Sequence, residues 1–467
     1  MSAQDVIDAI NEGSTVDEIK HLIDEYNIDV DESVGELRLR AIHHSVFKDR
    51  LDCVKLFLSH GCDINARDQC GFTPLHIAAR YNRADMANEL ITLGAHIDAS
   101  DSLGCAPLHH ALQKGHYNCS EVLLQHGAEA NTFYKTIGYE IHALPGIYSD
   151  CLELLLSYGA DPDARDTQGF VPLHHATRAR NKLYVYILLK NGADPDVLTL
   201  TTAPELQGKT PLQLAIFAPC KSIVELLLLY GANPNCKDEH RNTPLHHVAA
   251  RGHMEIAKLL IDHGAILTAR NTLRYHPLHR ACGAGATPEM IELLLENGAF
   301  VNSTTSLLET PAKCLLSHWQ EVNEDINGNG AGGDGADVVM KGRDEQCFQQ
   351  ILRLLDYGAR ITVSTRQHDA FSIIKWLPSL SRMKLTRYLL LEASVDTRLL
   401  NPEDKMQVEY TSAEFQDVFS RATNPLSLRQ ACRRIIRKEL GKRNLPEAVK
   451  QLQVPAILQS YLIFRSY

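Results

Sequence analysis

Apolar positions recur along this chain with the spacing of short amphipathic helices that come in pairs. Thr243 and Pro244 suit the cap and first position of a helix, and Leu245 then points toward a core. A second helix is predicted from Met254 to His263, with its apolar residues on one face. Gly264 suits the left-handed residue that ends it. The pattern predicts a helix, a turn, a second helix and a polar loop.

The same pattern returns at a nearly constant interval. The glycine that follows each second helix defines a period of 33 residues, at Gly61, Gly94, Gly127, Gly159, Gly192, Gly231, Gly264, Gly298 and Gly358. The proline that opens each first helix recurs in phase, at Pro74, Pro107, Pro172, Pro211, Pro244, Pro277 and Pro311. The repeated Thr-Pro-Leu-His and Leu-Leu-x-x-Gly-Ala phrases resemble the ankyrin repeat. The resemblance implies an all-α solenoid, with about ten to eleven units.

The repeat divides the chain into regions. Residues 1–33 are interpreted as a degenerate capping repeat with an acidic surface, and residues 34–303 as ankyrin repeats. Residues 304–396 are interpreted as degenerate repeats with an insertion near 322–345, whose Gly-rich centre predicts a flexible linker. A Thr-rich stretch at 198–207 is expected to lengthen one loop. A connector at 397–424 leads to a C-terminal module at 425–467.

The C-terminal module begins with a helix from Pro425 to Leu440 that Gly441 ends. Leu428, Cys432 and Ile436 are four residues apart and share one apolar stripe with Ile435, while basic residues take the other faces. Two further short helices are expected to follow near Pro446 and Pro455. Because so few residues rarely bury enough surface to stand alone, we expect a partner.

This module resembles a SOCS box, so the full fold is identified as an ankyrin solenoid followed by a three-helix SOCS box. The resemblance implies that Leu428, Cys432, Ile436 and Ile435 bind elongin C, which comes with elongin B. It implies a second contact, with cullin-5 and its RING partner, through Leu452, Val454, Pro455, Ile457 and Leu458. Gln453 departs from the family, which usually has proline there, and its effect on the cullin contact is left open.

Charge and composition narrow the classes of partner. The chain has a formal net charge of −10, yet residues 425–467 contain nine Lys or Arg and two Asp or Glu. Bulk nucleic-acid binding is therefore not expected, and no apolar run is long enough to span a membrane. The twelve cysteines form no CxxC pair, and the acidic N-terminus does not look like a signal peptide. A cytoplasmic location, with the nucleus as an alternative, is expected.

Candidate metal and catalytic groups are weak. Among the 22 histidines, those at positions 76, 109, 174, 246 and 279 occupy one repeat position, where the ankyrin resemblance implies hydrogen bonding between repeats. An EF-hand-like start at Asp325 has Ala336 where the bidentate glutamate is required. We expect no metal, no cofactor and no catalytic constellation, and hence a protein that is not an enzyme.

The combination of regions resembles the ankyrin repeat and SOCS box family. It implies a non-catalytic substrate receptor of an elongin B/C–cullin-5 RING ubiquitin ligase, whose array binds an unidentified target protein. Two alternatives remain, a scaffold whose last helices only cap the array, and a basic C-terminal helix for a membrane, nucleic acid or calmodulin. Candidate target contacts are Phe72, Arg80, Tyr81, Phe170, Arg178 and Arg180. An aromatic group near Tyr139 is interpreted as core filling, with a binding patch as the alternative.

Overall fold

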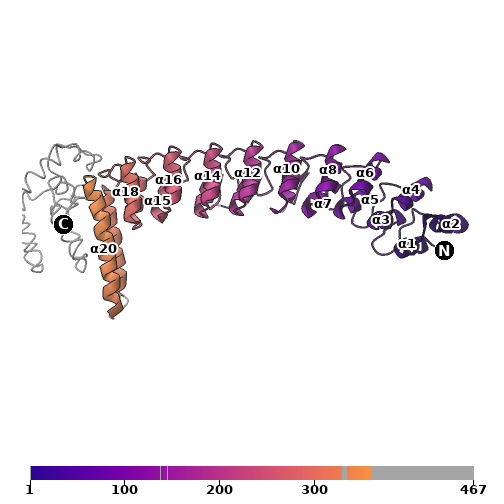
Figure 1. Ribbon diagram of the computed structural model, residues 1–467, viewed down its shortest axis with the longest axis horizontal. Helices are drawn as coiled ribbons and strands as arrows, with labels where there is room; N and C mark the ends of the chain where they lie inside the picture. Colours follow the sequence, from indigo (N-terminus) through magenta and orange to yellow (C-terminus); the bar gives the residue numbers. More distant parts are fainter. Residues whose placement is uncertain (1, 137, 145, 204, 329–333, 360–467) are drawn as a thin grey trace, which may run out of the picture. The chain divides into compact units, whose positions relative to one another are not determined.

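The computed structural model describes residues 2–136, 138–144, 146–203, 205–328 and 334–359 (Figure 1). It divides into an N-terminal unit that ends at Ala232 and a C-terminal unit that begins at Asn233. The predicted connector and SOCS box, with all of their site residues, lie outside the described residues.

Helices follow one another in pairs in both units. The helices of the N-terminal unit are α1 Ala3–Glu12, α2 Val16–Tyr26, α3 Ala41–Phe47, α4 Leu51–Ser59, α5 Pro74–Arg80, α6 Ala84–Thr92, α7 Pro107–Lys114, α8 Tyr117–Gln125, α9 Glu140–Ala143, α10 Ser149–Ser157, α11 Pro172–Arg178, α12 Lys182–Lys190, α13 Pro211–Phe217 and α14 Lys221–Leu229. Those of the C-terminal unit are α15 Pro244–Arg251, α16 Met254–Asp262, α17 Pro277–Gly283, α18 Pro288–Glu296, α19 Pro311–Gly328 and α20 Asp334–Asp356. Odd-numbered helices are called first helices below, and even-numbered ones second helices.

Within the N-terminal unit the pairs stack in chain order, so that first and second helices form two layers. The first helices pack α1 on α3, α3 on α5, α5 on α7, α7 on α9 and α11 on α13. Second helices pack α6 on α8, α8 on α10, α10 on α12 and α12 on α14. Figure 1 shows α5 and α7 in one layer and α6 and α8 in the other.

The core of each pair comes from the apolar stripe that the sequence predicted. Leu75 on α5 and Leu90 on α6 are both fully buried, with Ala78 and Ala87 between the helices. Burying one leucine side chain contributes about 1.5–3 kcal/mol. Since α5 also packs against α3 and α7, neighbouring pairs cover the apolar faces that one pair leaves open.

The loops before the first helices are also joined to each other. The Ser102 amide donates to the Cys70 carbonyl at 2.9 Å, and the Leu200 amide donates to the Gly169 carbonyl at 3.0 Å. Gly71 has a φ of +80°, and a Cβ there would meet the Ser102 nitrogen at 2.7 Å. Any other residue at Gly71 would therefore force this loop away from the next one. In one loop the backbone forms the strands β1 Phe133–Tyr134 and β2 Gly138–Tyr139, which pair antiparallel.

The all-α solenoid predicted from the repeat is confirmed. Residues 1–33 contain α1 and α2, which Gly13 and Asn27 end in the left-handed conformation. The Thr-rich loop closes on itself, since the Thr199 amide donates to the Lys209 carbonyl at 3.0 Å. The number of repeats stays a prediction.

The insertion near 322–345 is helical on both sides of residues 329–333, which lie outside the described residues, so the flexible linker predicted for its Gly-rich centre stays a prediction. Helix α19 continues to Gly328 and α20 begins at Asp334, so most of the insertion is helical. The physical reason is that both helices are anchored at their outer ends, α19 on α17 and α20 on α18. A helix already anchored by packing extends at low cost through residues of weak propensity.

A histidine in the first turn of most first helices holds the cap and the next loop together. His76 Nδ1 accepts a hydrogen bond from the Thr73 amide at 3.1 Å, and Nε2 lies 3.1 Å from the Cys105 carbonyl. Since Nδ1 accepts, Nε2 carries the proton and donates. His174, His246 and His279 make the corresponding contacts with Val197, Tyr275 and Ser303. The hydrogen-bonding role that the ankyrin resemblance implied is therefore observed for these four residues. The fifth, His109, differs, since its Nδ1 lies 3.4 Å from the Glu140 carboxylate.

Burial makes these histidines a source of pH dependence. Desolvation lowers the pKa of His76, His174, His246 and His279 from 6.5 to about 4. The native rings thus stay neutral down to about pH 4, while the unfolded chain takes up protons near pH 6.5. The stabilisation is complete above pH 6.5 and is lost as the pH falls toward 4.

We predict that the free energy of unfolding falls between pH 6.5 and 4.5, by roughly 1 kcal/mol per pH unit for each such histidine. His246→Gln should reduce this slope by the share of one histidine. Glutamine is the matched replacement because Gln213 occupies the equivalent position of α13, where its Oε1 accepts from the Thr210 amide at 3.0 Å. Urea unfolding followed by circular dichroism measures the slope. An unchanged slope in His246→Gln would contradict the assignment.

Candidate protein-binding surface

Two pairs of the candidate contact residues come together in the N-terminal unit. The guanidinium carbon of Arg80 lies 5.5 Å from the centre of the Phe72 ring, and that of Arg178 lies 5.4 Å from the centre of the Phe170 ring. Both arginines are the last residue of a first helix, α5 and α11. An arginine over an aromatic face is attracted by the ring quadrupole, which restricts the positions that the side chain samples.

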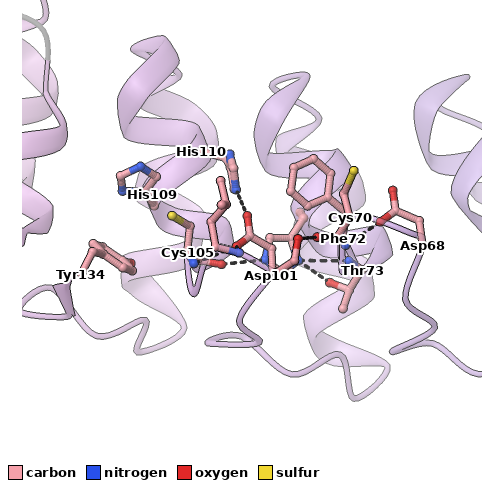
Figure 2. A network of polar contacts seen from close by, with 12 residues as sticks. Asp68, Cys70, Phe72, Thr73, Asp101, Cys105, His109, His110 and Tyr134 are labelled. Carbon is pink, nitrogen blue, oxygen red and sulfur yellow. Dashed lines mark hydrogen bonds and ion pairs between the residues drawn. The ribbon is translucent and has the colours of Figure 1, made fainter. Parts of the chain in front are cut away.

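Each ring is held by its own loop and by histidines. The Phe72 amide donates to Asp68 Oδ1 at 2.8 Å, and the Phe72 ring stacks on His76 at a centroid distance of 5.5 Å. His110 meets the same ring edge-on at 4.9 Å (Figure 2). The Phe170 amide makes the same bond to Asp166 Oδ1, at 2.9 Å.

The two aromatic rings differ in exposure. Phe72 is partly exposed, but only 2% of the Phe170 surface is accessible. From the sequence, Phe170 was a candidate target contact, which implies a surface residue. In the structure the ring lies beneath Arg178 and beside His175, with a centroid distance of 5.4 Å to the imidazole. Phe170 is therefore placed to support Arg178, which is the exposed member of the pair.

The remaining candidates lie just beyond the same helix ends. Tyr81 follows Arg80, is 47% exposed, and meets the exposed ring of Phe47 edge-on at 4.8 Å. Arg180 lies two residues beyond Arg178 and is exposed. The structure thus gathers the candidates at the ends of α3, α5 and α11, where guanidinium and aromatic groups are both accessible.

A set of aspartate–histidine pairs was missed by sequence reasoning. In three of the four histidine doublets, the second histidine bonds to an aspartate nine residues earlier, as His110 does to Asp101 at 2.9 Å (Figure 2). The others are His175 with Asp166 at 2.7 Å and His247 with Asp238 at 2.9 Å. The signal was present in the sequence, because each of these three doublets follows an aspartate at this fixed spacing, whereas His43-His44 has Gly35 there.

These pairs stabilise the loops and form no reactive centre. Asp101 Oδ1 accepts from the amides of Leu103 and Cys105, at 2.8 and 2.9 Å. Burial alone would raise the pKa of Asp101, but these amide bonds and His110 lower it overall. Burial lowers the pKa of His110 despite its partner. Among the described residues, no group of three or more His, Cys, Asp or Glu is arranged to hold a metal ion.

The aromatic group near Tyr139 divides between core and surface. Tyr134 is 2% exposed, and its hydroxyl donates to Glu140, which is fully buried within 3.4 Å of His109 Nδ1. Burial raises the pKa of Glu140. Phe133 is instead 51% exposed and meets Tyr139 at 5.2 Å. Core filling describes Tyr134, and Phe133 stays a candidate surface contact.

Arg180 has a left-handed backbone conformation, which glycine, asparagine and aspartate adopt more readily than arginine. Its φ is +55°, and the equivalent positions eight residues after the helix start are Asp49, Asn82 and Gly115, all with positive φ. Glycine, asparagine and aspartate tolerate this region, whereas a side chain such as arginine costs about 1–2 kcal/mol there. An outlier of this kind is a reason to consider a role for the side chain.

Comparisons with known proteins agree with this architecture. The family described as Ankyrin repeats (3 copies) matches residues 6–101, 42–134, 141–238 and 212–305, and the SOCS box family matches residues 424–463. Together these matches span most of the chain. The chain belongs to the ankyrin repeat and SOCS box family.

Relatives of the same class are found in mammals. Ankyrin repeat and SOCS box protein 16 of Homo sapiens is 27% identical over 364 residues, which cover 75% of this chain and 72% of the relative. The Mus musculus protein of that name is 27% identical over 362 residues, which again cover 75% of this chain and 72% of the relative. Among solved structures, the human ASB11 ankyrin repeat domain has a TM-score of 0.38 at 27% identity and covers 49% of this chain and 99% of its own.

Family membership supports a substrate-recognition role in a SOCS-box ubiquitin ligase, as an adaptor. A SOCS box in general implies elongin B/C and a cullin as partners. Within the described part of the chain, no helix has both the length and the apolar character to cross a membrane.

We predict that Arg180→Gly raises the free energy of unfolding by about 0.5–1 kcal/mol. Relief of the left-handed strain should exceed the entropy that glycine adds to the unfolded chain. Asn82→Gly is the matched control, and its effect should be smaller because asparagine already tolerates this conformation. Equilibrium urea unfolding measures both variants, and a loss of stability in Arg180→Gly would argue against backbone strain at this position.

Proposed function

We propose that this chain is the substrate-recognition subunit of an elongin B/C–cullin-5 RING ubiquitin ligase. The observation that carries the proposal is the SOCS box match at residues 424–463, behind an ankyrin array. In this proposal the array binds a target protein, and the C-terminal module docks on elongin C and on the cullin. A ubiquitin-conjugating enzyme bound to the RING subunit then modifies a nearby lysine of the target.

Such a receptor acts by proximity and needs no chemistry of its own. Holding the target beside the conjugating enzyme replaces an encounter in solution with a reaction at high effective concentration. We expect the location to be cytoplasmic, with the nucleus as the alternative.

The proposed elongin contact depends on one apolar stripe of the first SOCS-box helix. Leu428 is the anchor, and Cys432, Ile435 and Ile436 lie beside it at helical spacing. A buried leucine of this kind can supply the energy of an interface hot spot, about 2 kcal/mol or more. The proposed cullin contact uses Leu452, Val454, Pro455, Ile457 and Leu458.

A scaffold without ligase activity is the competing function. It would need no elongin B/C for soluble expression, because its last helices would be covered by the array. A free stripe of Leu428 and Ile436 should instead aggregate unless elongin B/C is co-expressed. Comparing soluble yield with and without elongin B/C separates the two.

We predict that Leu428→Ala with Cys432→Ala abolishes co-purification of elongin B/C, since it removes the anchor and its neighbour. The circular dichroism and the thermal unfolding of the array should not change. Gln430→Ala is the control on the same helix, because it lies off the apolar stripe, and it should retain elongin. Undiminished co-purification with the double variant would refute the assignment.

We further predict that Gln453→Pro tightens binding to cullin-5. Proline fixes φ and lowers the entropy lost when the segment is ordered against a partner. Gln451→Pro is the control, because proline there would enter the preceding helix and should not help. Titration of the purified elongin B/C complex with cullin-5 measures the affinity, and equal affinity for wild type and Gln453→Pro would count against the prediction.

A further inference from the structure

Charged residues of the N-terminal unit are divided between its two helix layers. The first helices α3, α5, α7, α11 and α13 contain no Asp or Glu, and three of them end in Arg80, Lys114 and Arg178. The second helices α6, α8 and α10 contain no Lys or Arg and carry acidic residues. The division is not complete. The second helices α2, α4, α12 and α14 contain lysine, and the first helices α1 and α9 contain Asp or Glu.

The helix dipole does not account for this division. Basic side chains at a helix C-terminus interact favourably with the dipole, so Arg80, Lys114 and Arg178 are each well placed for their own helix. Every second helix has the same dipole, yet α4, α6, α8, α10 and α14 have no basic residue in the last turn. Something common to one layer, rather than to helix ends, selects for positive charge.

The cations of the first-helix layer form no ion pairs among the described residues. Among ion pairs between described residues, none involves Arg80, Lys114, Arg178 or Arg180. Cations of the second layer are paired, as Lys55 is with Glu89 at 3.0 Å and Lys190 with Glu153 at 3.7 Å. The first layer therefore presents exposed positive charge that no carboxylate of the described residues neutralises.

Two of these cations are positioned in the same way. Arg80 over Phe72 and Arg178 over Phe170 occupy equivalent places in the third and sixth helix pairs. Stacking leaves the edge of each guanidinium free to donate two parallel hydrogen bonds, which match the two oxygens of a carboxylate. Tyr81 and Phe47 lie exposed beside Arg80 and offer apolar contact. Arg180, kept in a strained conformation next to Arg178, adds a further donor.

We propose that the exposed ends of α5, α7 and α11 bind an acidic segment of the target protein, whose Asp or Glu carboxylates are received by Arg80 and Arg178. Lys114 and Arg180 add attraction along the same layer. The proposal rests on the proposed function only in taking the occupant to be the ligase target. The positive charge at these helix ends, on a chain whose net charge is −10, favours an acidic partner by charge complementarity.

Nucleic acid offers phosphates to the same guanidinium groups, but the surroundings favour protein. A polyphosphate strand needs a continuous basic track, whereas the neighbouring second helices α6, α8 and α10 carry only acidic charges. The exposed Phe47 and Tyr81 suit apolar side chains between the carboxylates of a peptide.

The test uses the full chain, purified with elongin B/C, and short fluorescein-labelled peptides. One peptide alternates Glu and Ser, and the other replaces each Glu by Gln. Fluorescence anisotropy at low salt should show that the Glu peptide binds about tenfold more tightly than the Gln peptide. The double variant Arg80→Glu with Arg178→Glu should bind the Glu peptide about tenfold more weakly than wild type. Lys190→Glu is the matched control, because Lys190 is an exposed cation 6.0 Å above the Tyr186 ring on the second layer. Its affinity should stay within about twofold of wild type.

Arg180→Gly is an independent test, because its affinity for the Glu peptide should fall while its thermal stability rises. A loss of binding in this variant therefore cannot result from unfolding. If the charge-reversal variant fails to fold by circular dichroism, Arg80→Gln with Arg178→Gln replaces it. Equal affinity for both peptides, unchanged affinity in the double variant, or tighter binding of an oligodeoxythymidylate than of the Glu peptide overturns the proposal. Elongin B/C co-purification of the same samples reports separately on the proposed function, because the substitutions lie outside the SOCS box.

Discussion

The hydrogen bonds of a buried histidine, present in most repeats, are the interaction on which this structure depends. His76 accepts the Thr73 amide on one nitrogen and reaches the Cys105 carbonyl of the following loop with the other. A single side chain thus fixes the start of its helix and the position of the next repeat. The ring must stay neutral to do both, and burial ensures this by lowering its pKa. Neighbouring helices keep equivalent orientations for this reason, and equivalent residues, such as Arg80 and Arg178, occupy equivalent places.

Regular stacking also explains how one chain can separate structural and binding roles. Apolar faces are buried between helix pairs, and the aspartate–histidine pairs, such as Asp101 and His110, close the loops. The residues at the helix ends stay exposed, so they can vary without disturbing the core. In the N-terminal unit the ends of α5, α7 and α11 carry positive charge, and among the second helices only α12 ends in a basic residue, which gives the first-helix layer a chemical preference that no single repeat has. The SOCS box is a separate region of the sequence, so target choice and ligase docking can change independently.

Differences between expectation and structure have physical causes. The insertion near residues 322–345 reads as a linker from its glycines, but anchoring on α17 and α18 carries helices into both sides of it. Phe170 reads as a surface residue, but Arg178 and His175 cover it. In both cases the outcome depends on contacts with residues outside the local segment, and the composition of that segment does not reveal them. The aspartate–histidine pairs were visible as a spacing, yet only the bend of the loop shows that the two side chains meet.

The sequence by itself determined the repeat, the helix boundaries near each Pro and Gly, the buried histidines and the SOCS-box region, because these follow from local backbone preferences and from spacing along one helix. Only the tertiary structure decided which of the candidate surface residues are exposed, that arginine and phenylalanine form paired contacts, and that charge divides by layer. Those properties arise between helices that are distant in sequence. They depend on how neighbouring pairs stack, and periodicity within one repeat does not contain that information.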